Sequence, residues 1–263
     1  MKRFLPLFAA LLLATGCARG TPNSPILGPG ESPTPLQQAQ YVGIGKYVQL
    51  GEATATQMFG GVPYVTFVEV RQQKGSTFPH ADGAGFLYAY QGVHQLSRQD
   101  GERTTFVDQG TAVWIPPVVG ELDHVNAAND EQLWYFVSLR SIAQRKGTLA
   151  YPSYRIAYQT NDLRGSPPDK KLVHTLGYIT MDVNGRTSAH SHGGTESFYV
   201  LKGKVQLKTN DGQNTQLGVG QGASVNPGVI MQLRVVGDEP VQILTYFVRA
   251  EGEPWQTNVE TLP

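Results

Sequence analysis

An internal repeat constrains the fold of this chain more than any other sequence feature. Short runs rich in Val, Tyr, Phe and Thr are separated by turn residues, and the same series then recurs further along the chain. A single offset of 111 residues aligns Gly92 with Gly203, Gln95-Leu96 with Gln206-Leu207, Asp100-Gly101 with Asp211-Gly212, Pro116 with Pro227, and Tyr135-Phe136-Val137 with Tyr246-Phe247-Val248. An ordered set of matches without a gap predicts two copies of one domain.

The repeated unit has the pattern of β-structure. Helical periodicity is almost absent, and the runs are short and end at Gly, Pro or Asp-Gly turns. In the first copy they are Tyr64–Arg71, Phe86–Tyr90, Val93–Ser97, Thr105–Val107, Thr111–Ile115 and Leu133–Arg140. The chain has 263 residues with 40% apolar and 16% charged side chains, which suits a folded protein with many turns. We therefore expect an all-β sandwich or barrel in each copy.

The charge balance excludes one class of partner. Lys plus Arg and Asp plus Glu both number 21, so the chain has no basic excess for binding nucleic acid. We accordingly expect no nucleic-acid partner.

The N-terminus resembles a bacterial lipoprotein signal. Lys2 and Arg3 precede an apolar run of 11 residues, Phe4–Ala14, which is too short to span a bilayer as a mature helix. Small residues then lead to Cys17, the only cysteine of the chain. The resemblance implies cleavage before Cys17, lipidation of its thiol, and an extracytoplasmic location at the bacterial cell envelope. An ordinary signal peptide that contains a cysteine is the alternative.

Composition sets the expected domain boundaries. We expect a signal peptide at residues 1–16 and, because residues 18–40 are rich in Pro, Gly, Ser and Gln, a flexible tether at 17–50. The two β domains are expected at residues 51–140 and 169–250. A connector at 141–168 joins them, and a tail at 251–263 follows.

The second copy contains a cluster of metal-ligand residues. His190 and His192 are two positions apart, so on a strand they face the same side, and Glu196 can join them at an even spacing. Two imidazoles and a carboxylate suit Fe, Mn, Zn, Ni or Cu ions. The alternative is a pair of surface histidines at a polar turn. The position of the cluster inside a repeated β domain favours the metal site.

The same stretch resembles the first motif of the cupin family, a small antiparallel barrel related to the jelly roll. That motif reads G-x5-H-x-H, three or four residues, then E-x6-G. Here Gly185, His190, His192, Glu196 and Gly203 match it, with the first gap one residue short. The resemblance implies a bicupin, that is, two tandem cupin β-barrel domains, with His190, His192 and Glu196 as metal ligands.

The second cupin motif, G-x5-P-x-G-x2-H, departs from the pattern in this chain. Gly220 and Gly228 match it, whereas Pro227 is shifted by one and Met231 stands where the family has its fourth ligand, a histidine. Met231 is either a soft thioether ligand or an apolar wall residue, and we favour the wall. The remaining set of two histidines and one carboxylate leaves coordination positions open.

The first copy lacks ligands at the corresponding positions. These are occupied by Pro79, Ala81, Gly85 and Gly120. We therefore expect one working site, in the second domain. A second site from His80, Asp82 and His124 would require the loops to shift, and His94 and His174 are assigned no role.

Two functions from different classes remain open. The first is a metal-dependent enzyme of the cell envelope with Glu196 as its catalytic residue. Resemblance to cupins implies a quercetinase-like dioxygenase, an isomerase, a decarboxylase or an aminohydrolase, and the open coordination positions favour dioxygenase chemistry. The second is a lipoprotein that binds a small ligand or a metal without turnover. A purely structural bicupin that supports a homo-oligomer is a third, weaker reading. Arg234 is a candidate contact for an anionic substrate, although a solvated strand face suits it better.

Overall fold

The fold is all-β, as expected from the sequence. The computed structural model describes residues 41–42, 45–56, 62–80, 83–101, 103–117, 122–141, 154–163, 171–260 and 262. Within these ranges every regular element is a strand, and none of them contains a helix of the length and apolarity that crossing a membrane requires. The predicted signal peptide, Cys17, Ala81, Asp82 and Gly120 lie outside the described residues.

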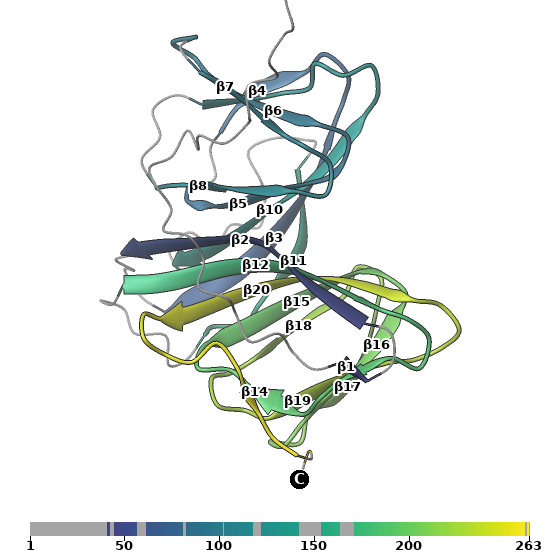
Figure 1. Ribbon diagram of the computed structural model, residues 1–263. Coiled ribbons are helices and arrows are strands. Elements are labelled where there is room, and N and C mark those ends of the chain that lie inside the picture. The colour runs from purple at the N-terminus through teal and green to yellow at the C-terminus, as the bar shows by residue number, and fades with distance from the viewer. Residues whose placement is uncertain are drawn as a thin grey trace, which may run out of the picture.

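Four sheets stack into two barrels (Figure 1). The first barrel contains a five-stranded sheet in the order β11 (Tyr154–Gln159), β3 (Pro63–Gln72), β10 (Gln132–Ser141), β5 (Gly85–Gln91) and β8 (Ala112–Ile115). Its second sheet has four strands in the order β4 (Thr77–Pro79), β9 (Leu122–Val125), β6 (His94–Arg98) and β7 (Thr104–Val107).

The second barrel has the same plan. Its five-stranded sheet runs β18 (Gly222–Val225), β15 (Thr195–Lys202), β20 (Val241–Ala250), β12 (Lys171–Met181) and β2 (Gly45–Thr56). The seven-stranded sheet runs β1 (Tyr41–Val42), β13 (Arg186–Thr187), β19 (Met231–Val235), β14 (His190–Ser191) and β21 (Thr257–Asn258). In that sheet β16 (Lys204–Thr209) pairs with both β19 and β17 (Asn214–Gly218).

The predicted repeat is visible strand by strand. Strands β5 to β10 of the first barrel correspond one by one to strands β15 to β20 of the second. Corresponding strands of the two series pair with corresponding partners, and the hairpin β6–β7 corresponds to the hairpin β16–β17. Gly101 and Gly212 occupy the hairpin turns with φ of 74° and 99°, a left-handed conformation that glycine adopts without steric cost. The two tandem jelly-roll-like barrels predicted from the sequence are therefore confirmed.

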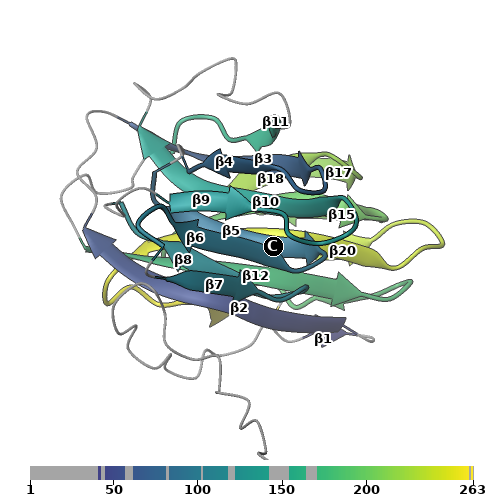
Figure 2. The ribbon, with the colours of Figure 1, turned by 90° about the horizontal axis from the view of Figure 1, so that it is seen from above.

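The two five-stranded sheets pack against each other between the barrels, as the stacked strands in Figure 2 show. Phe67, Phe86 and Tyr135 from the first barrel meet Tyr199 and Tyr246 from the second in one buried cluster. The strands of this junction are covered on both faces, so β3 and β10 are each buried at every position but one.

The N-terminal strand belongs to the second barrel rather than to the first. β2 pairs with β12 from Gly45, opposite Met181, to Thr56, opposite Lys171, and so covers the edge of that sheet. Residues 45–50, which the sequence placed in the tether, form its first half. β2 is half-buried along most of its length, so its sequence lacks the strict alternation that indicates a strand.

Candidate metal site

The loop between β14 and β15 positions the three predicted ligands. His190 lies on β14, His192 just after it, and Glu196 on β15. Gly193 and Gly194 between them have no side chain, and a Cβ on Gly194 would lie 2.1 Å from the carbonyl oxygen of Val248. The two glycines thus let the loop lie directly against the end of β20.

The three side chains converge as the sequence predicted. One ligand atom from each of His190, His192 and Glu196 lies within 4.8 Å of the others, and the residues are only 3%, 6% and 2% exposed. Nε2 of His192 is 3.2 Å from Oε2 of Glu196. Among the described residues this is the one group of three or more ligand-type side chains so arranged.

Hydrogen bonds fix which atom of each side chain faces the centre. Nδ1 of His190 donates to the carbonyl oxygen of Ser188 at 2.8 Å, and Nδ1 of His192 donates to that of Trp255. A carbonyl oxygen only accepts, so each ring carries its proton on Nδ1 and keeps the Nε2 lone pair free. The hydroxyl of Thr245 donates to Oε1 of Glu196 at 2.7 Å and leaves Oε2 for the centre.

The inward-facing atoms fit a bound cation. Nε2 of His192 and Oε2 of Glu196 are buried and have no hydrogen-bond partner among the described residues. With the proton of His192 on Nδ1, both atoms are acceptors, so their approach to 3.2 Å is unfavourable unless a cation lies between them. Burial and the neighbouring His192 also lower the pKa of His190, which keeps its ring neutral and able to coordinate.

Met231 lies beside this cluster. It pairs with His190 across β14 and β19, is fully buried, and lines the same pocket. Both of its sequence-derived roles, thioether ligand and apolar wall, are compatible with this place, and coordination by Met231 stays a prediction.

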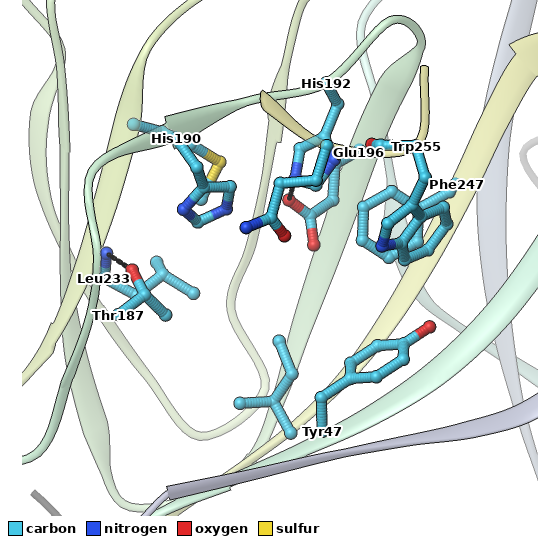
Figure 3. A pocket seen from close by; sticks show the side chains of 11 residues that line it. Tyr47, Thr187, His190, His192, Glu196, Leu233, Phe247 and Trp255 are labelled. Atoms are coloured by element: carbon cyan, nitrogen blue, oxygen red, sulfur yellow. Dashed lines mark hydrogen bonds and ion pairs between the residues drawn. The ribbon is translucent and has the colours of Figure 1, made fainter. Parts of the chain in front are cut away.

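The pocket above the ligands is small and largely apolar (Figure 3). It is partly open to solvent, and β2, β12, β19 and β20 supply its walls. These strands contribute Tyr47, Ile179, Leu233 and Phe247. Trp255 closes one side, its ring centre 4.0 Å from that of Phe247 and 5.8 Å from that of Tyr47.

Three of the pocket residues come from segments that we expected to lie outside both domains. Tyr47 comes from the segment assigned to the tether, and Trp255 and Gln256 come from the segment assigned to the tail. The peptide nitrogen of Gly193 donates to the carbonyl oxygen of Pro254, and β21 pairs with β14, so the C-terminal segment lies across the site. The sequence signal that could have identified this segment is Trp255, a large aromatic residue in an otherwise polar tail.

Replacing Thr245 by valine tests the orientation of Glu196. The variant keeps the volume of the side chain but removes the hydrogen bond to Oε1, so the carboxylate can rotate away from the histidines. We expect the affinity for a divalent metal to fall about 10- to 100-fold, measured by competition with a chelator. Thr66 is also buried on a strand and its hydroxyl has no hydrogen-bond partner among the described residues. Thr66→Val should therefore leave the affinity unchanged, and equal losses in both variants would contradict the orienting role.

The first barrel carries no matching cluster within the described residues. Pro79 and Gly85 occupy two of the ligand positions, as expected. His80, His124 and His94 form a hydrogen-bonded chain, with 3.0 Å from Nδ1 of His80 to Nε2 of His124 and 3.0 Å from Nδ1 of His124 to Nε2 of His94. Because the two nitrogens of His124 face different partners, the three rings do not converge on one point.

The buried histidines outside the metal site are held neutral. Burial lowers the pKa of His94 to about 3, and burial with the neighbouring His94 and His80 holds the pKa of His124 well below its usual value. His174 lies at the junction of the barrels, where its Nδ1 is 2.7 Å from the hydroxyl of Tyr246 and burial lowers its pKa to about 3. These rings are core residues with polar partners. Arg234 is exposed on β19, the strand face that the sequence favoured for it.

Comparison with known proteins supports the fold. Residues 177–247 match the family model of the cupin domain. Oxalate decarboxylase from Lactobacillus farciminis, in complex with formate, superposes with a TM-score of 0.52 at 10% identity, covering 81% of this chain and 88% of that one. A variant of the Bacillus subtilis oxalate decarboxylase gives 0.51 at 13% identity, covering 83% and 80%. Vicilin from tomato gives 0.47 at 10% identity, covering 79% and 76%. No curated protein matches the sequence.

These comparisons correct the expected order of reactions. Dioxygenase chemistry was placed ahead of decarboxylation, but the oxalate decarboxylase structures that superpose with TM-scores above 0.5 support a decarboxylase rather than a dioxygenase. The ranking was wrong because open coordination positions at a metal admit many reactions and do not select one with dioxygen.

Proposed function

We propose that this chain, whose residues 177–247 form a cupin domain, is a metal-dependent enzyme that acts on a small organic acid. The observation that carries the proposal is the pair of buried acceptor atoms on His192 and Glu196 that have no hydrogen-bond partner among the described residues, beside a neutral His190 and next to a small, largely apolar pocket. Such a pair is costly in an apoprotein core and is relieved by a cation.

The chain's own residues define what the site can do. His190, His192 and Glu196 would hold Mn, Fe, Zn, Ni or Cu, and the bound ion would act as a Lewis acid toward an oxygen of the substrate. Tyr47, Phe247 and Trp255 restrict access of water, which strengthens polar interactions inside the pocket. Glu196 is the acidic side chain among the residues that line the pocket and the candidate for proton exchange.

The reaction class we favour is cleavage of a carbon–carbon bond to a carboxylate. Its support is the fold shared with oxalate decarboxylases, together with a metal site in the cupin domain. We further propose attachment to the cell envelope through lipidated Cys17, for which the N-terminal sequence is the support. Assembly into a homo-oligomer stays a prediction.

Conversion of small organic acids by the metal-loaded full chain tests the proposal. We expect substrate loss and release of carbon dioxide, followed by NMR and gas analysis. Turnover should fall about 100-fold or more in Glu196→Gln, because the amide cannot exchange a proton. Glu131→Gln, at an exposed carboxylate, is the matched control. Equal turnover in wild type and Glu196→Gln would contradict a catalytic role of Glu196.

A non-catalytic binding protein is the second candidate. It is favoured by one observation: besides the three ligands, Tyr47 is the only titratable side chain among the residues that line the pocket. The two candidates differ in a single outcome. A protein that binds metal and small acids but converts none of them is a binding protein.

A further inference from the structure

The pocket around the proposed metal site has an unusual charge composition. Among the described residues, its lining contains one acidic side chain, Glu196, and no lysine or arginine. The neighbouring arginines are engaged or point elsewhere: Arg186 and Arg234 are exposed on β13 and β19, and Arg249 contacts Glu52 at 3.9 Å. No protein cation is therefore present in this pocket to balance a negatively charged ligand.

The charge balance of the site then depends on the metal and its ligands. An imidazole coordinates a metal in its neutral form, so His190 and His192 would add no charge, and a divalent cation with the carboxylate of Glu196 would leave one positive charge. A net charge in a small, largely apolar pocket is unfavourable in either sign. A ligand with one negative charge brings the site to neutrality. A ligand with two would leave a buried negative charge without a partner.

The polar groups in the pocket are suited to an uncharged end of such a ligand. The hydroxyl oxygen of Thr187 accepts a hydrogen bond from the peptide nitrogen of Leu233, so its proton is available to a ligand. The amide nitrogen of Gln256 donates to Asn258, which leaves the amide oxygen of Gln256 as an acceptor. Both groups are neutral, and each matches an amide, hydroxyl or similar group.

We infer that this pocket selects small monoanionic acids, with one carboxylate and an uncharged remainder, over dianions of the same shape. The inference rests on the proposed metal site. It separates this chain from the oxalate decarboxylases that share its fold, since their named substrate is a dicarboxylic acid.

Oxalate, oxamate and oxamide form a matched series for the test, because they have nearly the same shape and carry two, one and no negative charges near neutral pH. Binding to the Mn²⁺-loaded full chain would be measured by calorimetry, with metal content determined afterwards to detect extraction by oxalate. We expect oxamate to bind at least about tenfold more tightly than either oxalate or oxamide. Free Mn²⁺ in water prefers the dianion on Coulombic grounds, so the protein must reverse that order.

A substitution that supplies the absent cation sharpens the test. Gln256→Lys places an ammonium group at the pocket, and we expect the ratio of oxalate to oxamate affinity to rise at least about tenfold. Gln256→Met has a similar length and no charge, and it also removes the amide oxygen that can accept from oxamate, so the ratio should rise less in this variant than in Gln256→Lys. An equal shift in both variants would show that shape rather than charge sets the preference and would overturn the inference.

The remaining outcomes are separable. If the wild type retains Mn²⁺ and binds oxalate as tightly as oxamate, or binds none of the three compounds, the inference is wrong and the metal site stands. If the wild type binds no divalent metal, the proposed function fails with it.

Discussion

The His192→Ala variant is expected to lose tight binding of a divalent metal. The substitution removes one of three converging ligands and leaves Oε2 of Glu196 without the neighbour that lies 3.2 Å away. Removing a group that only orients a ligand costs about 10- to 100-fold in affinity, so removal of a ligand should exceed that range. The measurements are the metal content by elemental analysis and the metal affinity by competition with a chelator. Both use the chain without residues 1–17.

Two variants control for loss of fold and for the role of Met231. His80→Ala removes a partly buried histidine of the first barrel, outside the ligand cluster, and should keep the metal. Met231→Leu nearly conserves volume at the wall of the same pocket and should also keep it, because a thioether is a weak ligand. Unchanged metal content in folded His192→Ala would refute the assignment of the site. Loss in Met231→Leu would make Met231 a ligand.

Gly194→Ala is expected to be the most destabilising small substitution near the site. The added Cβ would lie 2.1 Å from the carbonyl oxygen of Val248 and 2.6 Å from Cα of Arg249. These are backbone atoms at the end of β20, so the clash cannot be relieved by a side-chain rotation. We expect a loss of about 3 kcal/mol in the free energy of unfolding, at the upper end of what overpacking costs. Denaturant unfolding followed by tryptophan fluorescence measures it.

Gly218→Ala is the matched control for this substitution. Its added Cβ would have one neighbour within 4 Å, the side-chain oxygen of Gln221 at 3.6 Å, which is an ordinary contact. The free energy of unfolding should change by less than about 0.5 kcal/mol. A similar stability of the two variants would mean that the loop between His192 and Glu196 can move away from β20, and that the ligand geometry is not held by this contact.

The ligand triad was predictable because its geometry is local. His190, His192 and Glu196 lie within seven consecutive residues, so only a short segment separates them. β14 ends at Ser191 and Glu196 lies on β15, so the turn between the two strands brings the side chains together, and not the two-residue periodicity of one strand that the sequence suggested. The absence of ligands from the first copy could be derived in the same way, from the repeat offset. Met231 was placed in the same pocket by the second motif, but sequence spacing does not decide between a ligand and a wall.

The pocket-lining residues that come from the ends of the chain could not be predicted from local patterns. Tyr47 reaches the site because β2 pairs with β12, more than a hundred residues later in the chain. Gly177 permits its position, since a Cβ there would lie 2.4 Å from the ring of Tyr47. Trp255 and Gln256 reach it because β21 pairs with β14. β2 is half-buried along most of its length and β21 has only two residues, so neither strand gives a strong hydrophobic period.

The sequence by itself determined that two β-barrels follow one another and that the second holds a metal-ligand triad. Turn glycines, strand-type runs and ligand spacing are properties of neighbouring residues, and they are repeated at one offset. Only the tertiary structure decided which atoms face the centre of the triad and that, among the described residues, no lysine or arginine lines the pocket. Those facts depend on contacts between distant segments, among them the hydrogen bond from His192 to Trp255 and the exposure of Arg234 on the outer face of β19.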